Sequence, residues 1–218
     1  MAENFAHQMN LFDPRLARPV VVIGAGAIGS WVTLALAKMG VSDITVIDGD
    51  TVASHNGSMS LYTGADTARL KVEVLRERVR ELAGVEIKVV PEMYSGGPLP
   101  KGVTVIASVD TIPARKLIWK QLLQQRFSHD LLVDTRTSAA YAEVYAVNPK
   151  NGRDREEYER SLPPEDKAAP QTCGFHGVIF ASLHVAACVA STVARYWQTG
   201  QKVTCRPLKS DTFEVVKL

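Results

Sequence analysis

The chain has 218 residues, 46% hydrophobic and 22% charged, so it is long enough to bury a full core in one large or two small domains. Its formal net charge is +2, and no basic block is interleaved with aromatics, which disfavours nucleic acid as the main partner. The three cysteines, Cys173, Cys188 and Cys205, form no Cys-x-x-Cys pair, which excludes a disulfide framework and a four-thiolate zinc site and suits a reducing cytoplasm.

The sequence predicts neither a signal peptide nor a membrane-spanning helix. The first twenty residues contain no cationic stretch followed by an apolar core, so we expect no signal peptide. The longest apolar run, 177–193, carries His184 in its middle and is short for a membrane span. We therefore expect a buried helix there and no membrane partner.

Strand-like and helix-like segments alternate from residue 19 to about 126, which is typical of βαβ units and a mostly parallel sheet. The helix expected at 66–83 opens on an acidic residue, Asp66, and carries one apolar stripe. The expected strands are 20–23, 43–48, 85–90, 103–108 and 130–135, and the expected helices are 27–40, 66–83 and 111–126.

The second half of the chain departs from this alternation. The strand at 139–149 follows the previous one too closely for a parallel crossover, so we expect antiparallel pairing there. Segment 150–172 is charged and contains prolines, which suggests a mobile crossover loop, and 201–218 is expected to form a C-terminal hairpin. The sequence thus predicts a single α/β domain over residues 1–218, with a Rossmann-like sheet, helices on both faces and an N-terminal arm at 1–18.

A glycine-rich turn follows the first strand. Gly24, Gly26 and Gly29 have the G-x-G-x-x-G spacing, and Asp48 lies at the end of the next strand. Such a turn permits close approach of a phosphate to the backbone and to a helix N-terminus, and the acid can accept hydrogen bonds from ribose hydroxyls. NAD, FAD and ATP all remain possible ligands, and the glycines could instead serve only helix–strand packing.

Further polar residues follow at strand ends and in the adjoining loops. Asp50 lies at the end of the second strand, Asn56 follows in a loop, and Lys71 lies in the first turns of the next helix. Asp110 comes directly after a later strand, at the edge of the sheet where ligands bind, with Arg115 five residues on. A carboxylate there could bind Mg²⁺ and a lysine could neutralise phosphate, which suits phosphate chemistry better than hydride transfer. Alternatively, Lys71 is a solvated surface lysine and Asp110 only caps a helix.

The sequence resembles the ThiF/MoeB-type superfamily of ubiquitin-activating-like adenylyltransferases from about residue 20 to the C-terminus. The resemblance is carried by GAGAIGS, by DGDTV with its following asparagine, by Lys71, by Asp110 with Arg115, and by TCGFHGVIFASL at 172–183. It implies an enzyme that uses Mg·ATP to adenylate the C-terminal glycine carboxylate of a small ubiquitin-like or sulfur-carrier protein.

The resemblance also implies roles for individual residues. The glycine turn, including Ala27, would wrap the phosphates, Asp48 and Asp50 would lie at the nucleotide, Asn56 and Lys71 would contact phosphate, and Asp110 would bind Mg²⁺. Cys173 stands where some members keep a cysteine that takes the activated acyl group, and a thiol near a helix N-terminus can have a lowered pKa. A small buried hydrophobe is the other reading of Cys173.

Two features depart from the family pattern. Met59 stands where members generally carry an arginine that holds the outer phosphates, with Arg69 the nearest basic substitute in sequence. The paired Cys-x-x-Cys motifs are also missing, so we expect no zinc and a place in the small, zinc-free branch. Members of that branch commonly form homodimers in which an N-terminal arginine reaches the partner's nucleotide, and Arg15, rather than Arg18, is our candidate.

Three functions follow. The first is an ATP-dependent adenylyltransferase, with Cys173 as the candidate acceptor of the activated acyl group. The second, suggested by Met59, is a weak or inactive member that serves as a carrier-binding scaffold. The third is an NAD-dependent oxidoreductase, which only the glycine turn and Asp48 support.

Overall fold

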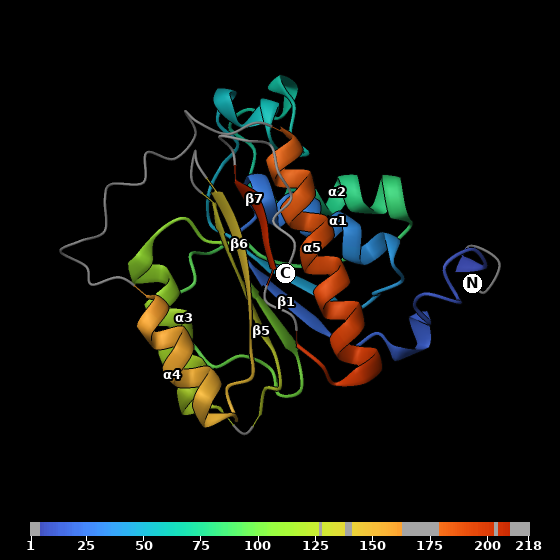
Figure 1. Ribbon diagram of the computed structural model, residues 1–218. Helices are drawn as coiled ribbons and strands as arrows, with labels where there is room; N and C mark the ends of the chain where they lie inside the picture. Colours follow the sequence, from blue (N-terminus) through green and yellow to red (C-terminus); the bar gives the residue numbers. More distant parts are fainter. Residues whose placement is uncertain (1–4, 127, 138–140, 163–178, 203–204, 210–218) are drawn as a thin grey trace.

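The computed structural model describes residues 5–126, 128–137, 141–162, 179–202 and 205–209. Its centre is a 7-stranded sheet in the order β3-β2-β1-β4-β5-β6-β7 (Figure 1). The first five strands pair in parallel, and β6 pairs antiparallel with both β5 and β7. The strands are β1 (Val20–Ile23), β2 (Ile44–Ile47), β3 (Lys88–Val90), β4 (Thr104–Ala107), β5 (Leu132–Thr137), β6 (Tyr141–Val147) and β7 (Cys205–Lys209).

Helices cover both faces of the sheet (Figure 1). One face carries α1 (Ala27–Lys38), α2 (Lys71–Ala83) and α5 (Ile179–Thr199), and the other carries α3 (Ile112–Gln124) and α4 (Gly152–Ser161). Alternate residues of a strand point to opposite faces, so Val20 and Val22 enter one hydrophobic cluster while Val21 and Ile23 enter the other. Burial on both faces explains the unbroken apolar run of β1. The predicted fold class is confirmed.

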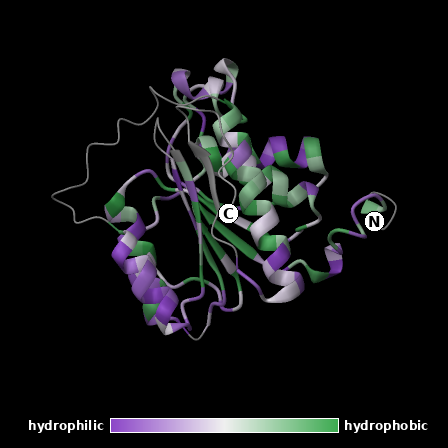
Figure 2. Ribbon diagram, in the orientation of Figure 1, coloured by the Kyte–Doolittle hydropathy of each residue, from purple (hydrophilic) through white to green (hydrophobic). Residues whose placement is uncertain are grey.

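Helix α5 is a core helix in this fold. Within the described part of the chain it is the one helix long and apolar enough, by length and composition, to cross a membrane. Its residues Val185, Val189 and Val193 are fully buried in the cluster shared with α1. In Figure 2 its apolar and polar residues are mixed, whereas α4 is largely hydrophilic. The expectation of a buried helix is confirmed for one side of α5.

The helix expected from Asp66 begins later, so its predicted acidic cap is wrong. Leu70 occupies the N-cap position of α2. Asp66 instead closes a short 3₁₀ turn, η4 (Gly64–Asp66), where its carboxylate accepts hydrogen bonds from the backbone N–H and hydroxyl of Thr63 at 2.8 Å. It also pairs with Arg78 of α2 at 3.2 Å. The acid therefore fastens the turn to the helix rather than starting the helix.

The segment expected to be a crossover loop, 150–172, begins instead with a helix, α4. Asn151 caps it by accepting from the N–H of Asp154, whose carboxylate in turn accepts from the N–H of Asn148 at 2.7 Å. Only Tyr158 of this helix is buried, so the sequence has almost no apolar periodicity to reveal it. Residues 163–172, and residues 210–218 of the expected hairpin, lie outside the described residues.

The described part of the N-terminal arm packs at the far ends of α1 and α5. The ring of Phe12 lies 6.1 Å from that of Trp197, and Gln198 donates to the carbonyl of Leu11 at 2.8 Å. Pro14 lies against Gly40, just beyond the end of α1. The arm is therefore placed at the opposite end of α1 from the glycine turn, about 18 Å away along its 12 residues.

Candidate nucleotide-binding site

The three glycines of the β1–α1 turn are not equivalent. Gly24 has φ of +98°, and a methyl group on it would collide with the carbonyl of Ser108. A methyl on Gly29 would collide with the carbonyl of Gly24. A methyl on Gly26 would meet nothing within 4 Å. Packing therefore accounts for Gly24 and Gly29, whereas Gly26 leaves open space at the turn.

That open space lies at the start of α1. The first N–H groups of the helix, from Ala27 on, have no intrahelical acceptor because no helical turn precedes them. Gly26 is the N-cap residue and supplies no side-chain cap to them either. The N-terminus also carries the positive end of the helix dipole. The turn thus fits an anionic phosphate group without rearrangement of its glycines.

Asp48 holds this turn from the end of β2. Asp48 is 8% exposed, and its carboxylate accepts hydrogen bonds from the N–H of Ala25 at 2.6 Å and from the N–H of Asp50 at 2.8 Å. The predicted sugar-binding acid is therefore brought next to the glycine turn. Part of its hydrogen-bonding capacity is used to shape that turn.

Tyr62, which no sequence pattern marks as a site residue, also holds this turn. Its buried hydroxyl donates to the carbonyl of Ala25. Burial, together with the nearby charge of Asp48, raises the pKa of Tyr62 well above its usual value. The phenol therefore stays protonated and remains a donor to the turn.

Lys71 is not a solvated surface lysine. Its side chain is 12% exposed, and its Nζ lies 2.8 Å from a carboxylate oxygen of Asp50. The backbone N–H of Lys71 also donates to the carbonyl of Asp50 at 2.9 Å. The pair brings a cation to the same sheet edge as Asp48.

Asn56 lies in η3 (Ser54–Ser58), where its side-chain oxygen accepts from the N–H of Ala53 at 2.8 Å. Met59 follows, and its carbonyl accepts from the indole of Trp31 on α1 at 2.9 Å. The loop is thus fastened over the first half of α1. Arg69, the expected substitute for an arginine at position 59, is paired with Glu77 at 2.6 Å and is already engaged by a carboxylate.

Asp110 is exposed and lies three residues after the end of β4, the strand that pairs with β1 through Ala107 and Ile23. The N–H of Ser108 donates to the carbonyl of Ile23 at 2.8 Å, which places this loop against the glycine turn. No three His, Cys, Asp or Glu side chains gather into a metal-binding group within the described residues. A Mg²⁺ held by Asp110 would therefore take its other ligands from phosphate and water, as is usual for this ion.

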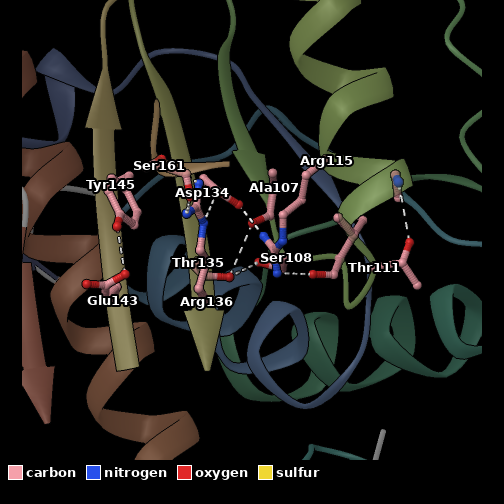
Figure 3. A network of polar contacts seen from close by, with 12 residues as sticks. Ala107, Ser108, Thr111, Arg115, Asp134, Thr135, Arg136, Glu143, Tyr145 and Ser161 are labelled. Atoms are coloured by element: carbon pink, nitrogen blue, oxygen red, sulfur yellow. Dashed lines mark hydrogen bonds and ion pairs between the residues drawn. The ribbon is translucent and has the colours of Figure 1, made fainter. Parts of the chain in front are cut away.

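A buried polar network, which was not predicted from the sequence, joins β5 to the end of β4 and the loop that follows it (Figure 3). Asp134 of β5 is fully buried and is contacted by Arg115 of α3 and by Arg136, the latter at 2.8 Å. Tyr158 donates to the same carboxylate at 3.1 Å. The signal available in sequence was a pair of opposite charges two residues apart inside the apolar strand LLVDTRT.

Arg15 is not brought to this edge by the described contacts. Arg15 is exposed and pairs with Asp13 at 2.6 Å, in the arm at the far end of α1. A role toward the nucleotide of a second copy stays a prediction. Arg18 lies 3.8 Å from Asp130. Cys173 lies outside the described residues.

The sheet and the glycine turn define a protein of the Rossmann-like fold class, and the comparison with known families identifies the family. The model of the ThiF family matches residues 15–212. The chain therefore belongs to the ThiF family, within the E1-like adenylyltransferase superfamily, and the resemblance seen in the sequence is confirmed.

Curated relatives match over short segments. The tRNA threonylcarbamoyladenosine dehydratase of Haemophilus influenzae is 42% identical over 62 residues, which is 28% of this chain and 24% of that protein. The adenylyltransferase and sulfurtransferase uba4 of Emericella nidulans is 41% identical over 76 residues, 34% of this chain and 15% of that protein. The matched segments thus span a quarter or less of these relatives.

Solved structures share the fold over most of the chain. The Escherichia coli tRNA N6-threonylcarbamoyladenosine dehydratase TcdA has a TM-score of 0.65 at 16% identity, covering 91% of this chain and 95% of that one. Escherichia coli MccB crystallised with ATP has a TM-score of 0.69 at 15% identity, covering 93% of this chain and 64% of that one.

Proposed function

We propose that the protein is an ATP-dependent adenylyltransferase. The observation that carries this proposal is one sheet edge that combines a glycine turn open at Gly26, the Asp50–Lys71 pair and Asp110. Family membership and the likeness to an ATP-bound structure support it. An oxidoreductase would use the turn and Asp48 but would leave Lys71 and Asp110 without a role.

The chemistry requires a carboxylate to approach an anionic α-phosphate. Bound Mg²⁺ would neutralise phosphate charge and stabilise the pyrophosphate leaving group. The α1 N-terminus would orient the phosphates, Asp110 would hold the metal ion, and Lys71 would leave Asp50 to contact phosphate oxygens. Asp48 would accept from the ribose while keeping the turn in shape. Asn56 would contact phosphate from its loop.

The proposed substrate is the C-terminal glycine carboxylate of a small ubiquitin-like or sulfur-carrier protein, in a cytoplasmic homodimer. Cys173 is the proposed acceptor of the activated acyl group in a transfer step that follows adenylation. Arg15 of each copy is proposed to reach the nucleotide bound by the other copy. Met59 favours a slower enzyme or a carrier-binding scaffold, because loss of a charged contact to phosphate costs about 1.5–3 kcal/mol.

A tRNA substrate is the second candidate, and the dehydratase relatives favour it. Threonylcarbamoyladenosine carries a free carboxylate, so adenylation would activate a group of the same kind. The composition disfavours nucleic acid as partner, but such a substrate would need only the one modified nucleoside to reach the sheet edge.

The two substrates separate in one experiment. The protein is incubated with Mg·ATP and either a panel of carriers ending in glycine or total tRNA containing threonylcarbamoyladenosine, and pyrophosphate release is measured together with intact mass. We expect release and an adenylated mass with a carrier. Release with tRNA alone would select the second candidate. Tight carrier binding without release would leave only the scaffold.

A further inference from the structure

The loop that carries Asp110 is held on both sides. Toward β1, Ser108 donates to the carbonyl of Ile23 at 2.8 Å, and its own carbonyl lies where a side chain on Gly24 would have to be. Toward α3, Thr111 caps the helix by accepting from the N–H of Ala114 at 3.3 Å (Figure 3). Asp110 therefore sits between two fixed points.

Arg115 adds a third constraint on the residue before Asp110. Its guanidinium reaches back from the first turn of α3 and donates to the carbonyl of Val109 and to a carboxylate oxygen of Asp134. Arg115 is 3% exposed, and its Nε has no partner among the described residues. A buried guanidinium with so few contacts depends on Asp134 for both its charge balance and its orientation.

Asp134 in turn joins this loop to the end of α4. Its second carboxylate oxygen accepts from Arg136 at 2.8 Å and from Tyr158 at 3.1 Å. Arg136 also donates to the carbonyl of Ser161 at 2.8 Å and lies 4.2 Å from the ring centroid of Tyr145. Asp134 thus divides its two oxygens between the Asp110 loop and α4.

We propose that Arg115 and Asp134 are positioning residues that set Asp110 for Mg·ATP. This inference rests on the proposed function, because Asp110 must be the metal ligand. Neither residue touches the nucleotide. Asp134 orients Arg115, and Arg115 fixes the peptide before Asp110. Outer residues that orient a metal ligand typically change metal affinity by about 10–100-fold when replaced.

The test measures ATP binding by calorimetry as a function of Mg²⁺ concentration, on the folded full-length chain. We expect Asp134→Asn and Arg115→Lys to raise about tenfold the Mg²⁺ concentration at which the gain in ATP affinity is half-maximal. The ATP affinity of both variants in EDTA should stay within about twofold of that of the wild type. Tyr158→Phe is the matched control. It removes a buried contact to the other oxygen of Asp134, so a purely structural effect would appear in it equally.

The outcomes are distinct. The inference is overturned if Asp134→Asn leaves the Mg²⁺ dependence of ATP binding unchanged. If that variant does not fold, an unchanged Mg²⁺ dependence in Arg115→Lys overturns it instead. An equal shift in Tyr158→Phe also overturns it. No Mg²⁺ effect on ATP binding by the wild-type protein refutes the magnesium site and the inference together. If Mg²⁺ tightens ATP binding but no substrate gives pyrophosphate release, the proposed function is refuted. The shift in Mg²⁺ dependence between the variants and the wild type still decides the inference.

Discussion

The three glycines of the β1–α1 turn can be separated by single substitutions. Gly29→Ala places a methyl against the carbonyl of Gly24, so we expect the free energy of unfolding to fall by about 1–3 kcal/mol. Gly26→Ala meets no atom within 4 Å and should change stability by less than about 1 kcal/mol. Its methyl would occupy the space left for phosphate, so ATP affinity should fall instead.

Urea denaturation and ATP titration of both variants check this pair. Equal loss of stability in the two would mean that Gly26 also serves packing, and unchanged ATP affinity in Gly26→Ala would place the phosphates elsewhere.

His129 predicts a pH dependence of stability. It is fully buried, its Nε2 has no partner among the described side chains, and burial lowers its pKa from 6.5. Below about pH 6.5 the unfolded chain therefore binds a proton that the folded chain does not, and the free energy of unfolding falls as the pH falls, by up to about 1.4 kcal/mol per pH unit.

Unfolding of wild type and His129→Gln between pH 8 and 5.5 tests this. The free energy of unfolding should fall more steeply in the wild type than in the variant as the pH drops below about 6.5. Parallel curves would show that His129 does not titrate in this way.

Helix α5 carries the prediction that belongs to a whole element. Val189 is fully buried beside α1, and Leu183 of the same helix is exposed. We expect Val189→Ala to lower the free energy of unfolding by about 2 kcal/mol and Leu183→Ala by less than about 0.5 kcal/mol, measured at dilute protein concentration. A larger cost for Leu183 than for Val189 would mean that the exposed side of α5 is the side that is covered in solution.

Elements with a strong local pattern were predictable from sequence, and elements that depend on distant contacts were not. The apolar run before GAGAIG predicts β1, because both faces of that strand are buried. The glycine turn after the strand then predicts the start of α1. Helix α4 was missed because a single residue, Tyr158, faces the core. The start of α2 was misplaced because Asp66 resembles a cap but binds Thr63 and Arg78 instead.

The candidate site follows the same division. Gly26, Asp48, Lys71 and Asp110 could be found because each stands at a strand end or helix start that the spacing reveals. Sequence alone could not show that Lys71 pairs with Asp50, nor that Arg115 pairs with Asp134, since the members of these pairs are 21 and 19 residues apart. Tyr62 was missed because its partner is a backbone carbonyl 37 residues away.

For the whole molecule, the strand order brings the carboxyl ends of β1, β2 and β4 side by side, and it is there that the glycine turn, Asp50 with Lys71, and Asp110 meet. The opposite edge carries a similar pair, Lys88 with Asp43, also at 2.8 Å but at the amino ends of β2 and β3. The two pairs join the same charged groups but differ in the edge they occupy and in exposure, since the side chain of Lys88 is 72% exposed and that of Lys71 is 12% exposed.

The most direct test is therefore substrate-dependent exchange of pyrophosphate into ATP by wild type, Lys71→Ala, Asp110→Ala and Lys88→Ala, with each variant first shown to be folded. The proposed function predicts exchange that falls about 100-fold or more in Lys71→Ala and Asp110→Ala and is unchanged in Lys88→Ala. Exchange that persists in both site variants, or that falls equally in Lys88→Ala, would contradict an ATP site at this edge of the sheet.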